Sequence, residues 1–227
     1  MLLHFPQVFL PYKDKIGIYC ETEIDGNNIK ALKENFKFKS IAWCKQPHED
    51  KVYIADTDLV FLASADAIIT KEKQLPLLIR TADCLPVMIY DPKNEIIANI
   101  HAGWRSQSKN IITQTIQKMK SKYGSLAEDL CIFSGPSLAK CCAHFSDPYT
   151  ELPHWMHPFI LESDTESEKQ RVDLKSALKF ELQENGVHEI HMEISPICTC
   201  CSEEDWHSVR KDIAKKRIGN LIWMKNT

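Results

Sequence analysis

The chain has 227 residues, of which 44% are hydrophobic and 26% charged, and its 28 basic and 31 acidic side chains give a net charge of −3. This composition excludes a disordered or fibrous protein, and a chain of this length can bury a core without disulfide or metal staples. The balanced charge offers no basic field for nucleic acid, and no stretch approaches the ~20 apolar residues that span a bilayer.

The first strands are predicted in the middle of the chain. Short apolar runs cover Leu75 to Arg80, Pro86 to Tyr90 and Glu95 to Ile100, and Val52 to Ile54 forms a weaker one. Between the second and third of these runs lies Asp91 to Asn94, with Asp at the first turn position and Pro at the second. This favours a type I turn and therefore a tight hairpin.

Helices and further strands follow the hairpin. Ser108 is a suitable N-cap and Gly124 a suitable stop for a helix whose apolar positions recur at helical spacing, namely Ile111, Ile112, Ile116, Met119 and Tyr123. A second helix is expected over Leu174 to Asn185, and strands return at His188 to Ile194 and at Leu221 to Met224. Because strands and helices mix without steady alternation, we expect an α+β fold, a mixed sheet core covered by helices in a single domain, residues 1–227.

The nine cysteines indicate a reducing compartment. Their number is odd, and the apolar N-terminal segment is broken by Pro6 and Pro11 and lacks the pattern of a signal peptide. We therefore expect a soluble, cytoplasmic protein with free thiols. The spacing of Cys141-Cys142 and of Cys198, Cys200 and Cys201 does not suggest a common zinc knuckle, so these side chains are expected to be small buried hydrophobes.

Two short segments carry most of the chemistry, one ending in Cys84 and the other beginning with His101. The predicted hairpin separates them, and its open end would bring them close together. His48 precedes another short predicted strand. Two histidines and a cysteine suit Zn²⁺, and three protein ligands leave the fourth tetrahedral position for water or substrate, which is typical of a catalytic site.

The run TADCLPVMIYD followed by HAGWR resembles the laccase-domain family, also called the multicopper polyphenol oxidase family, whose bacterial members include the peptidoglycan-editing factor and purine nucleoside phosphorylases. The resemblance covers about residues 40–224. Further matching pieces are Gln46-x-His48, Ala65 to Thr70, Gly135 to Leu138 with Cys142, Cys198-Thr199 and Ser208-x-Arg210.

The resemblance implies stacked mixed β-sheets flanked by helices, and it maps the family's metal ligands onto His48, Cys84 and His101. The chain departs from the family pattern at Ala143 and His144, at Asn220, and at Glu49. These departures are expected to bear on substrate choice more than on the metal site.

The implied activity is that of a zinc-dependent purine nucleoside enzyme, which splits adenosine, inosine or related nucleosides with inorganic phosphate as co-substrate or deaminates adenosine. Its partner is a small-molecule substrate, with no nucleic acid and no membrane. Two alternatives stay open. One is a copper-dependent polyphenol oxidase with Cu²⁺ in place of zinc, and the other is a hydrolase of peptidoglycan precursors with Cys84 as nucleophile and His101 as base.

Neighbours of these residues receive supporting roles. Arg105 is expected either to contact phosphate as a fourth catalytic residue or to pair with a buried carboxylate such as Asp83. Asp83 itself is expected to fix the turn rather than to bind the ion, because neighbouring side chains on an extended chain point to opposite faces. Gln46 is expected to orient His48. Arg210 and Ser208 are expected at the pocket rim or on the surface.

Overall fold

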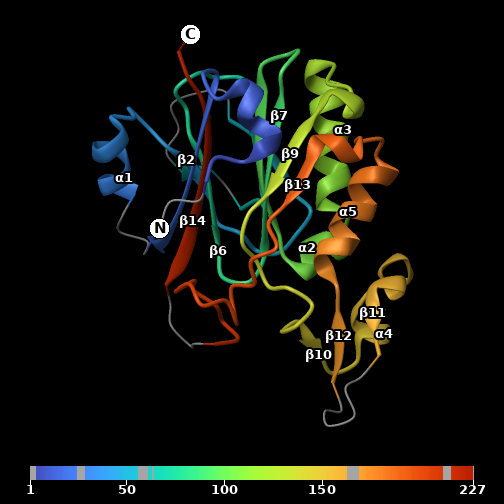
Figure 1. The fold of residues 1–227 in the computed structure, drawn as a ribbon. Coiled ribbons are helices and arrows are strands. Elements are labelled where there is room, and N and C mark those ends of the chain that lie inside the picture. The colour runs from blue at the N-terminus through green and yellow to red at the C-terminus, as the bar shows by residue number, and fades with distance from the viewer. Residues whose placement is uncertain are drawn as a thin grey trace.

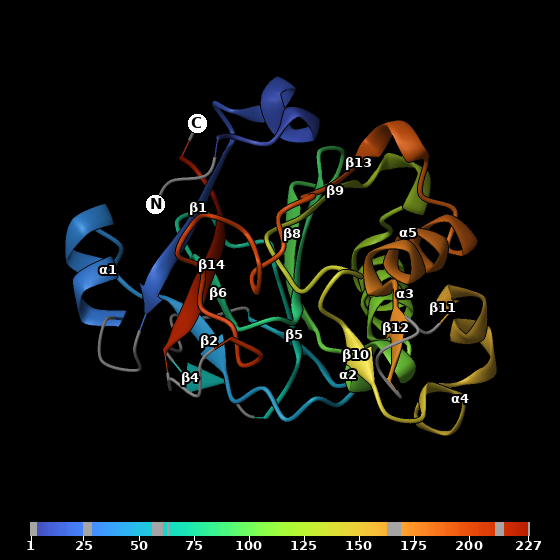
Figure 2. The ribbon, with the colours of Figure 1, turned by 60° about the horizontal axis from the view of Figure 1, so that its bottom comes forward.

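The structure is a computed structural model that describes residues 4–24, 29–55, 61–62, 64–162, 169–211 and 216–226. Two sheets lie face to face, and helices cover their outer faces (Figures 1 and 2). This arrangement confirms the α+β fold with stacked mixed sheets. Among the described residues, no helix is long and apolar enough to cross a membrane.

The first sheet has five strands and mixes parallel with antiparallel pairs. Its order is β1 (Ile16–Ile24), β14 (Arg217–Met224), β6 (Leu77–Thr81), β2 (Ala42–Cys44) and β4 (Phe61–Leu62). β14 runs antiparallel to both of its neighbours, whereas β2 runs parallel to β6 and β4. Helix α1 (Ile29–Phe36) packs on the outer face of this sheet through Leu32, beside Leu78 and Leu221.

The second sheet has six strands and is also mixed. Its order is β13 (Met192–Ile194), β9 (Cys131–Ser134), β7 (Leu85–Asp91), β8 (Ile96–Ala102), β5 (Ala67–Thr70) and β3 (Val52–Ile54). Helices α3 (Ile111–Tyr123) and α5 (Leu174–Glu184) cover its outer face, as Figure 2 shows. The short helix α2 (Trp104–Ser108) links β8 to α3.

The remaining elements are short. A three-stranded antiparallel sheet has the order β10 (His144–Phe145), β12 (Gln170–Val172) and β11 (Ile160–Leu161), and α4 (Pro148–Glu151) lies beside it. Four 3₁₀ helices are described, namely η1 (Gln7–Tyr12), η2 (Ala127–Asp129), η3 (His154–Phe159) and η4 (Glu189–His191).

The central strand β7 shows why this chain forms two stacked cores. Val87 and Ile89 lie in the cluster between the six-stranded sheet and the helices, and Met88 and Tyr90 lie in the cluster between the two sheets. Successive side chains of a strand point to opposite faces, so a strand covered on both sides is apolar throughout. All seven residues of β7 are buried.

The predicted hairpin is present, and its turn is built as the sequence indicates. β7 and β8 pair antiparallel from Leu85 opposite Ala102 to Asp91 opposite Ile96. The Asp91 carboxylate accepts the main-chain N–H of Lys93 at 2.9 Å and closes the turn.

Other predicted boundaries are wrong in detail. Ser108 ends α2 instead of capping α3, which begins after Asn110, a residue with a left-handed backbone at φ 59°. Residues 189–191 form a 3₁₀ turn before the short strand β13, because the chain leaves the helix layer there. Strand β14 starts four residues earlier than expected, at Arg217.

The chain passes from the five-stranded to the six-stranded sheet at three places in its described part. The crossings lie between β2 and β3, between β4 and β5, and between β6 and β7. Two of them bend through left-handed backbone at non-glycine residues, His48 with φ 64° and Asp83 with φ 85°. Such conformations are uncommon outside glycine and are concentrated at functional sites.

Candidate metal centre

Three donor side chains meet where the sheets are joined. His48 comes from the β2–β3 crossing, Cys84 from the β6–β7 crossing, and His101 from β8. One ligand atom of each lies within 4.8 Å of the other two. Cys84 Sγ is 3.8 Å from His48 Nε2, and the two imidazole rings are nearly perpendicular with centroids 4.6 Å apart.

The hairpin register accounts for two of the three donors. His101 is paired with Pro86, so Cys84 lies just beyond the last paired residues at the open end. Along β8, Ile97 faces the five-stranded sheet and Asn99 donates its side-chain amide to the Leu77 carbonyl of that sheet. His101 is next in this alternation and therefore points to the same side, between the sheets.

Gly103 makes room for the other two donors. A Cβ at this position would lie 2.8 Å from His48 Cδ2 and 3.0 Å from Cys84 Sγ. Its φ of −69° is open to any residue, so the requirement is for space. The glycine of the HAGWR segment is thus explained by the side chains that pack against it.

Asp66, in the crossing between β4 and β5, anchors the centre. Its buried carboxylate accepts hydrogen bonds from His101 Nδ1 at 2.7 Å, from the His48 main-chain N–H at 3.1 Å and from the Glu49 N–H at 2.7 Å. With Nδ1 held in this way, Nε2 of His101 is the nitrogen left for a ligand. Metal-bound imidazoles commonly give their second N–H to a carboxylate.

Asp66 was not singled out from the sequence, where it stood only within the matching piece Ala65 to Thr70. The available signal was a carboxylate directly before the short, largely apolar and fully buried strand β5.

The electrostatics of the centre favour a thiolate. Burial raises the pKa of the Cys84 thiol, but His101 and His48 outweigh it and lower the pKa to about 6. Burial likewise lowers the pKa of His101, whereas Cys84 and Asp66 raise it to about 9. In the absence of a bound ion, both pKa shifts favour a thiolate on Cys84 beside an imidazolium on His101.

These donors fit a borderline-soft divalent cation. A thiolate and two imidazoles are the ligand types that Zn²⁺ prefers, and a set of three leaves one tetrahedral position open. Replacement of the His101 proton by an ion would keep the Asp66 hydrogen bond intact. The chemistry of the side chains thus agrees with a metal centre at these three residues.

Two supporting residues have other partners than expected. Gln46 exchanges hydrogen bonds with the main chain of Arg80 at 2.6 and 2.9 Å, so it ties the β2–β3 crossing to β6 rather than orienting the His48 ring. Asp83 accepts the Thr199 hydroxyl at 2.8 Å and the Arg210 N–H at 3.1 Å. These contacts take the place of the Arg105 pairing considered for Asp83.

Arg105 lies on the exposed side of α2, two residues beyond Gly103. Its guanidinium carbon is 4.0 Å from the centroid of the Trp104 ring, whose own edge packs near Phe145. This cation–π contact fixes an exposed guanidinium on α2, two residues along the chain from Gly103.

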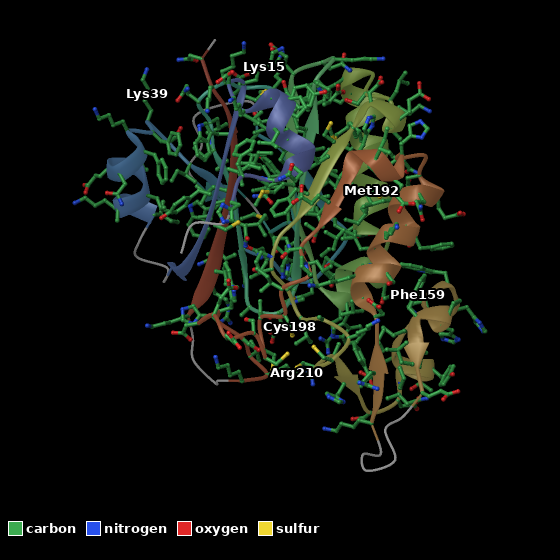
Figure 3. All side chains as sticks on the ribbon, viewed as in Figure 1. Lys15, Lys39, Phe159, Met192, Cys198 and Arg210 are labelled. Atoms are coloured by element: carbon green, nitrogen blue, oxygen red, sulfur yellow. The ribbon has the colours of Figure 1, made fainter. Side chains whose placement is uncertain are left out.

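A cleft lies beside the loop that contacts Asp83 through the Arg210 N–H. It has a volume of about 400 Å³ and is lined by Cys142, His144, Lys169, Cys200 and Arg210. Figure 3 shows Arg210 near Cys198, among sulfur atoms at the lower end of the sheets. Ser208 is buried and accepts the Arg210 N–H at 3.1 Å, so it shapes the loop instead of lying on the surface.

The positions at which the chain departs from the family pattern differ in how deeply they are buried. Asn220 is fully buried in β14 and donates to the Thr81 hydroxyl at 3.0 Å, so it belongs to the sheet interior. Ala143 is also buried, whereas His144 lines the cleft. Of these positions, His144 is the one placed to affect what enters the cleft.

Comparison with known proteins gives concordant matches. The family model described as multi-copper polyphenol oxidoreductase laccase matches residues 22–225. A protein named purine nucleoside phosphorylase from Clostridium acetobutylicum is 31% identical over 217 residues, 90% of each chain. One of the same name from Campylobacter jejuni is 29% identical over 94% of each chain.

Solved structures with the same fold include two from bacilli. The hypothetical protein YfiH of Bacillus licheniformis has a TM-score of 0.78 at 27% identity, covering 88% of this chain and 80% of its own. YlmD of Geobacillus stearothermophilus has a TM-score of 0.83 at 21% identity, covering 97% and 94%.

Proposed function

This chain belongs to the multi-copper polyphenol oxidoreductase laccase family, and from that premise we propose that it is a zinc-dependent purine nucleoside phosphorylase. Relatives of that name align along most of the chain, which supports an enzyme acting on purine nucleosides. The observation that carries the proposal is the convergence of His48, Cys84 and His101, with Asp66 behind them.

In the proposed reaction a phosphate oxygen attacks the anomeric carbon of the nucleoside. The bond from that carbon to the purine nitrogen breaks, its electron pair leaves with the base, and the base takes up a proton. The products are ribose 1-phosphate and the free purine. A zinc ion in the centre would supply Lewis-acid polarisation of a substrate atom at its open position.

Residues of the chain itself would orient the metal ligands and bind the phosphate. Asp66 holds the His101 ring in one orientation, and Gly103 keeps the space that His48 and Cys84 occupy. Arg105 is proposed to bind the phosphate, because a guanidinium matches phosphate oxygens in bidentate fashion and this exposed side chain follows Gly103, which packs against His48 and Cys84, by two residues.

One observation favours a second candidate. A Cys84 thiolate beside a protonated His101 is also what a cysteine nucleophile needs, and both shifts in pKa point that way. In that case the protein would be a metal-independent hydrolase or amidase. The two candidates differ in whether zinc or free Cys84 is required.

The test measures zinc content and base release together. Wild-type protein, His101→Ala and Cys84→Ser are assayed for metal by mass spectrometry and for free base from adenosine and inosine, with and without phosphate. His154→Ala, an exposed histidine on η3, is the matched control. We expect phosphate-dependent base release that disappears with zinc in both site variants and persists in the control.

Other outcomes would assign a different activity to the chain. Base release without phosphate would indicate hydrolysis, and ammonia from adenosine would indicate deamination. Oxidation of a phenol by copper-loaded protein would favour the oxidase. Activity in zinc-free protein that iodoacetamide abolishes at Cys84 would replace the metal enzyme by the cysteine hydrolase.

A further inference from the structure

A second group of metal-ligating side chains lies outside the centre already described. Cys141 and Cys142 belong to the turn after β9, and Cys198 and Cys201 to the turn after β13. Their four sulfur atoms all lie within 4.8 Å of one another, and Cys141 Sγ is 3.4 Å from Cys201 Sγ. Sulfur atoms are visible beside the labels of Cys198 and Arg210 in Figure 3.

The backbone holds these two turns together without any help from the thiols. Ser137 and Cys198 form an isolated parallel bridge, in which the Ser137 N–H donates to the Ile197 carbonyl at 3.4 Å and the Thr199 N–H to the Ser137 carbonyl at 3.1 Å. The Cys142 N–H closes the first turn on the Ala139 carbonyl at 2.9 Å, and the Ser202 N–H closes the second on Cys198 at 3.1 Å. The sulfur atoms are therefore brought together by the fold itself.

The spacing of the sulfur atoms matches a tetrahedral thiolate site. With a metal–sulfur distance of about 2.3 Å, ligands at the corners of a tetrahedron are about 3.8 Å apart. All four sulfur atoms lie within 4.8 Å of one another, and the Cys141–Cys201 pair is 3.4 Å apart, which is compatible with that spacing. Contrary to the expectation from their spacing, Cys198 and Cys201 are separated by two residues, the gap found in many zinc sites.

Burial explains the place of Cys198, which lies in the core, and of the half-buried Cys142, but not that of the other two thiols. Cys141 and Cys201 are exposed, contrary to the expectation of small buried hydrophobes. A positive charge lies close by, because Lys175 donates its ammonium to the carbonyl oxygens of Ser195 and Ile197, directly before Cys198. An ammonium in this position stabilises a site whose four thiolates exceed the charge of a divalent ion.

We propose that Cys141, Cys142, Cys198 and Cys201 form a second, structural binding site for a thiophilic divalent cation such as Zn²⁺. Four protein ligands leave no open position, so this site is not catalytic. Binding releases the thiol protons to solvent, and no oxidation is involved.

The bound ion would stabilise the two turns that contact the β6–β7 crossing, which carries Cys84. Leu138, close to the first pair of thiols, donates its N–H to the Asp83 carbonyl at 2.8 Å, and Thr199, within the second turn, donates its hydroxyl to the Asp83 carboxylate at 2.8 Å. Asp83 immediately precedes Cys84. An ion bound to both turns would therefore stabilise the backbone from which Cys84 projects.

The first experiment counts zinc in the intact protein. Zinc per chain is measured after purification with added Zn²⁺ for wild type, Cys201→Ser, Cys141→Ser and Cys200→Ser. Cys200 lies in the same turn but outside the group of four, so it is the matched control. We expect both exposed-cysteine variants to lose one zinc equivalent, whereas the control keeps the wild-type count. Equal counts in all four proteins would overturn the proposal.

The second experiment separates this site from the first centre. In a His101→Ala background, Co²⁺ should still give the visible bands of tetrahedral cobalt and a sulfur-to-cobalt charge-transfer band, and a further Cys201→Ser substitution should abolish both. No cobalt spectrum in the His101→Ala protein, while wild type gives one, would overturn the proposal. So would a Cys141–Cys201 disulfide in protein purified anaerobically with zinc, detected by the missing thiol hydrogens in its intact mass.

The structural role has its own readout. Removal of the second ion by Cys201→Ser should lower the thermal midpoint of the zinc-loaded protein more than Cys200→Ser does. A chelator that strips zinc from both variants should lower the midpoint of the Cys200→Ser control further and so remove most of the difference between them. Equal midpoints for the two variants would exclude the fastening of these loops. Because both centres are counted separately, failure here leaves the proposed catalytic function untouched.

Discussion

Asp66 and His101 are joined twice. The His101 main-chain N–H donates to the Asp66 carbonyl at 2.7 Å, and its ring Nδ1 contacts the Asp66 carboxylate, also at 2.7 Å. The same carboxylate receives the N–H groups of His48 and Glu49. One buried residue thus sets both the position of the strand that carries His101 and the orientation of the ring, and it fixes the bend that carries His48.

Asp66→Asn should weaken zinc binding about 10- to 100-fold, the usual cost of losing a carboxylate behind a metal-bound histidine. The amide cannot accept all three donors, because its nitrogen would face one of the N–H groups. A competition titration with a chromogenic chelator measures the change. Asp91→Asn, a buried carboxylate at the far end of the hairpin, is the control, and equal affinities in the two variants would contradict the role of Asp66.

Gly103→Ala should abolish zinc binding while the fold survives, because the new Cβ overlaps His48 and Cys84. Gly124→Ala should instead lower stability without affecting zinc binding. Gly124 ends α3 at φ 76° with open space around it, so alanine there should cost about 1 kcal/mol of stability and leave the zinc count unchanged. Metal analysis and urea unfolding of both variants check the pair, and a zinc-loaded Gly103→Ala protein would contradict the packing argument.

Arg105→Ala should raise the KM for phosphate by ~10-fold or more with little loss of zinc, since a hydrogen bond to a charged group contributes about 1.5–3 kcal/mol. Arg105→Lys should recover part of the affinity, because it keeps the charge but loses the planar fork and the stacking on Trp104. Steady-state kinetics with varied phosphate measure both. Lys118→Ala, on the exposed face of α3, is the control, and an unchanged phosphate KM in Arg105→Ala would remove Arg105 from this role.

Glu181→Gln should change how stability depends on pH. Glu181 is buried on α5, where burial raises its pKa from 4.5 to about 7 against the lowering effect of two hydrogen bonds from Thr113. Between these values the unfolded chain has released the proton and the folded chain keeps it. The free energy of unfolding therefore falls as the pH rises through this window, by about 3 kcal/mol, and is constant above it.

The Gln variant has no proton to release, so its stability should lack this fall. Urea unfolding of wild type and variant at several pH values between 4 and 8 isolates the contribution as a difference. Glu184→Gln, exposed on the same helix, should follow the wild-type curve. Parallel curves for wild type and Glu181→Gln would show that the carboxyl is already ionised across the range.

Local patterns in the sequence predict the parts of this molecule that are local in space. The β7–β8 hairpin depends on two apolar runs and one Asp-Pro turn, so the sequence alone places Cys84 near His101. The helices α3 and α5 follow from apolar periodicity in the same way. In these elements the pattern that predicts the structure spans a single short segment of the chain, which is what periodicity reports.

The rest depends on contacts between distant segments. Asp66 reaches His101 across 35 residues, and Cys141 reaches Cys201 across 60. Neither contact leaves a periodic trace, because each is made where a strand ends and the chain turns away. His48 was placed in the site by its resemblance to a family motif, and its left-handed backbone could not be read from its side-chain type.

The three crossings between the sheets have a consequence for folding order. Cys84 and His101 can meet as soon as one hairpin forms, and Asp66 joins them when β5 pairs with β8 in the same sheet. His48 arrives on the β2–β3 link, which is aligned only after both sheets have docked. A chain with its six-stranded sheet formed and its sheets undocked would therefore hold zinc by two ligands, weakly and without His48. The appearance of tightly bound zinc would then report the docking of the two sheets, a step that circular dichroism does not report because it follows secondary structure.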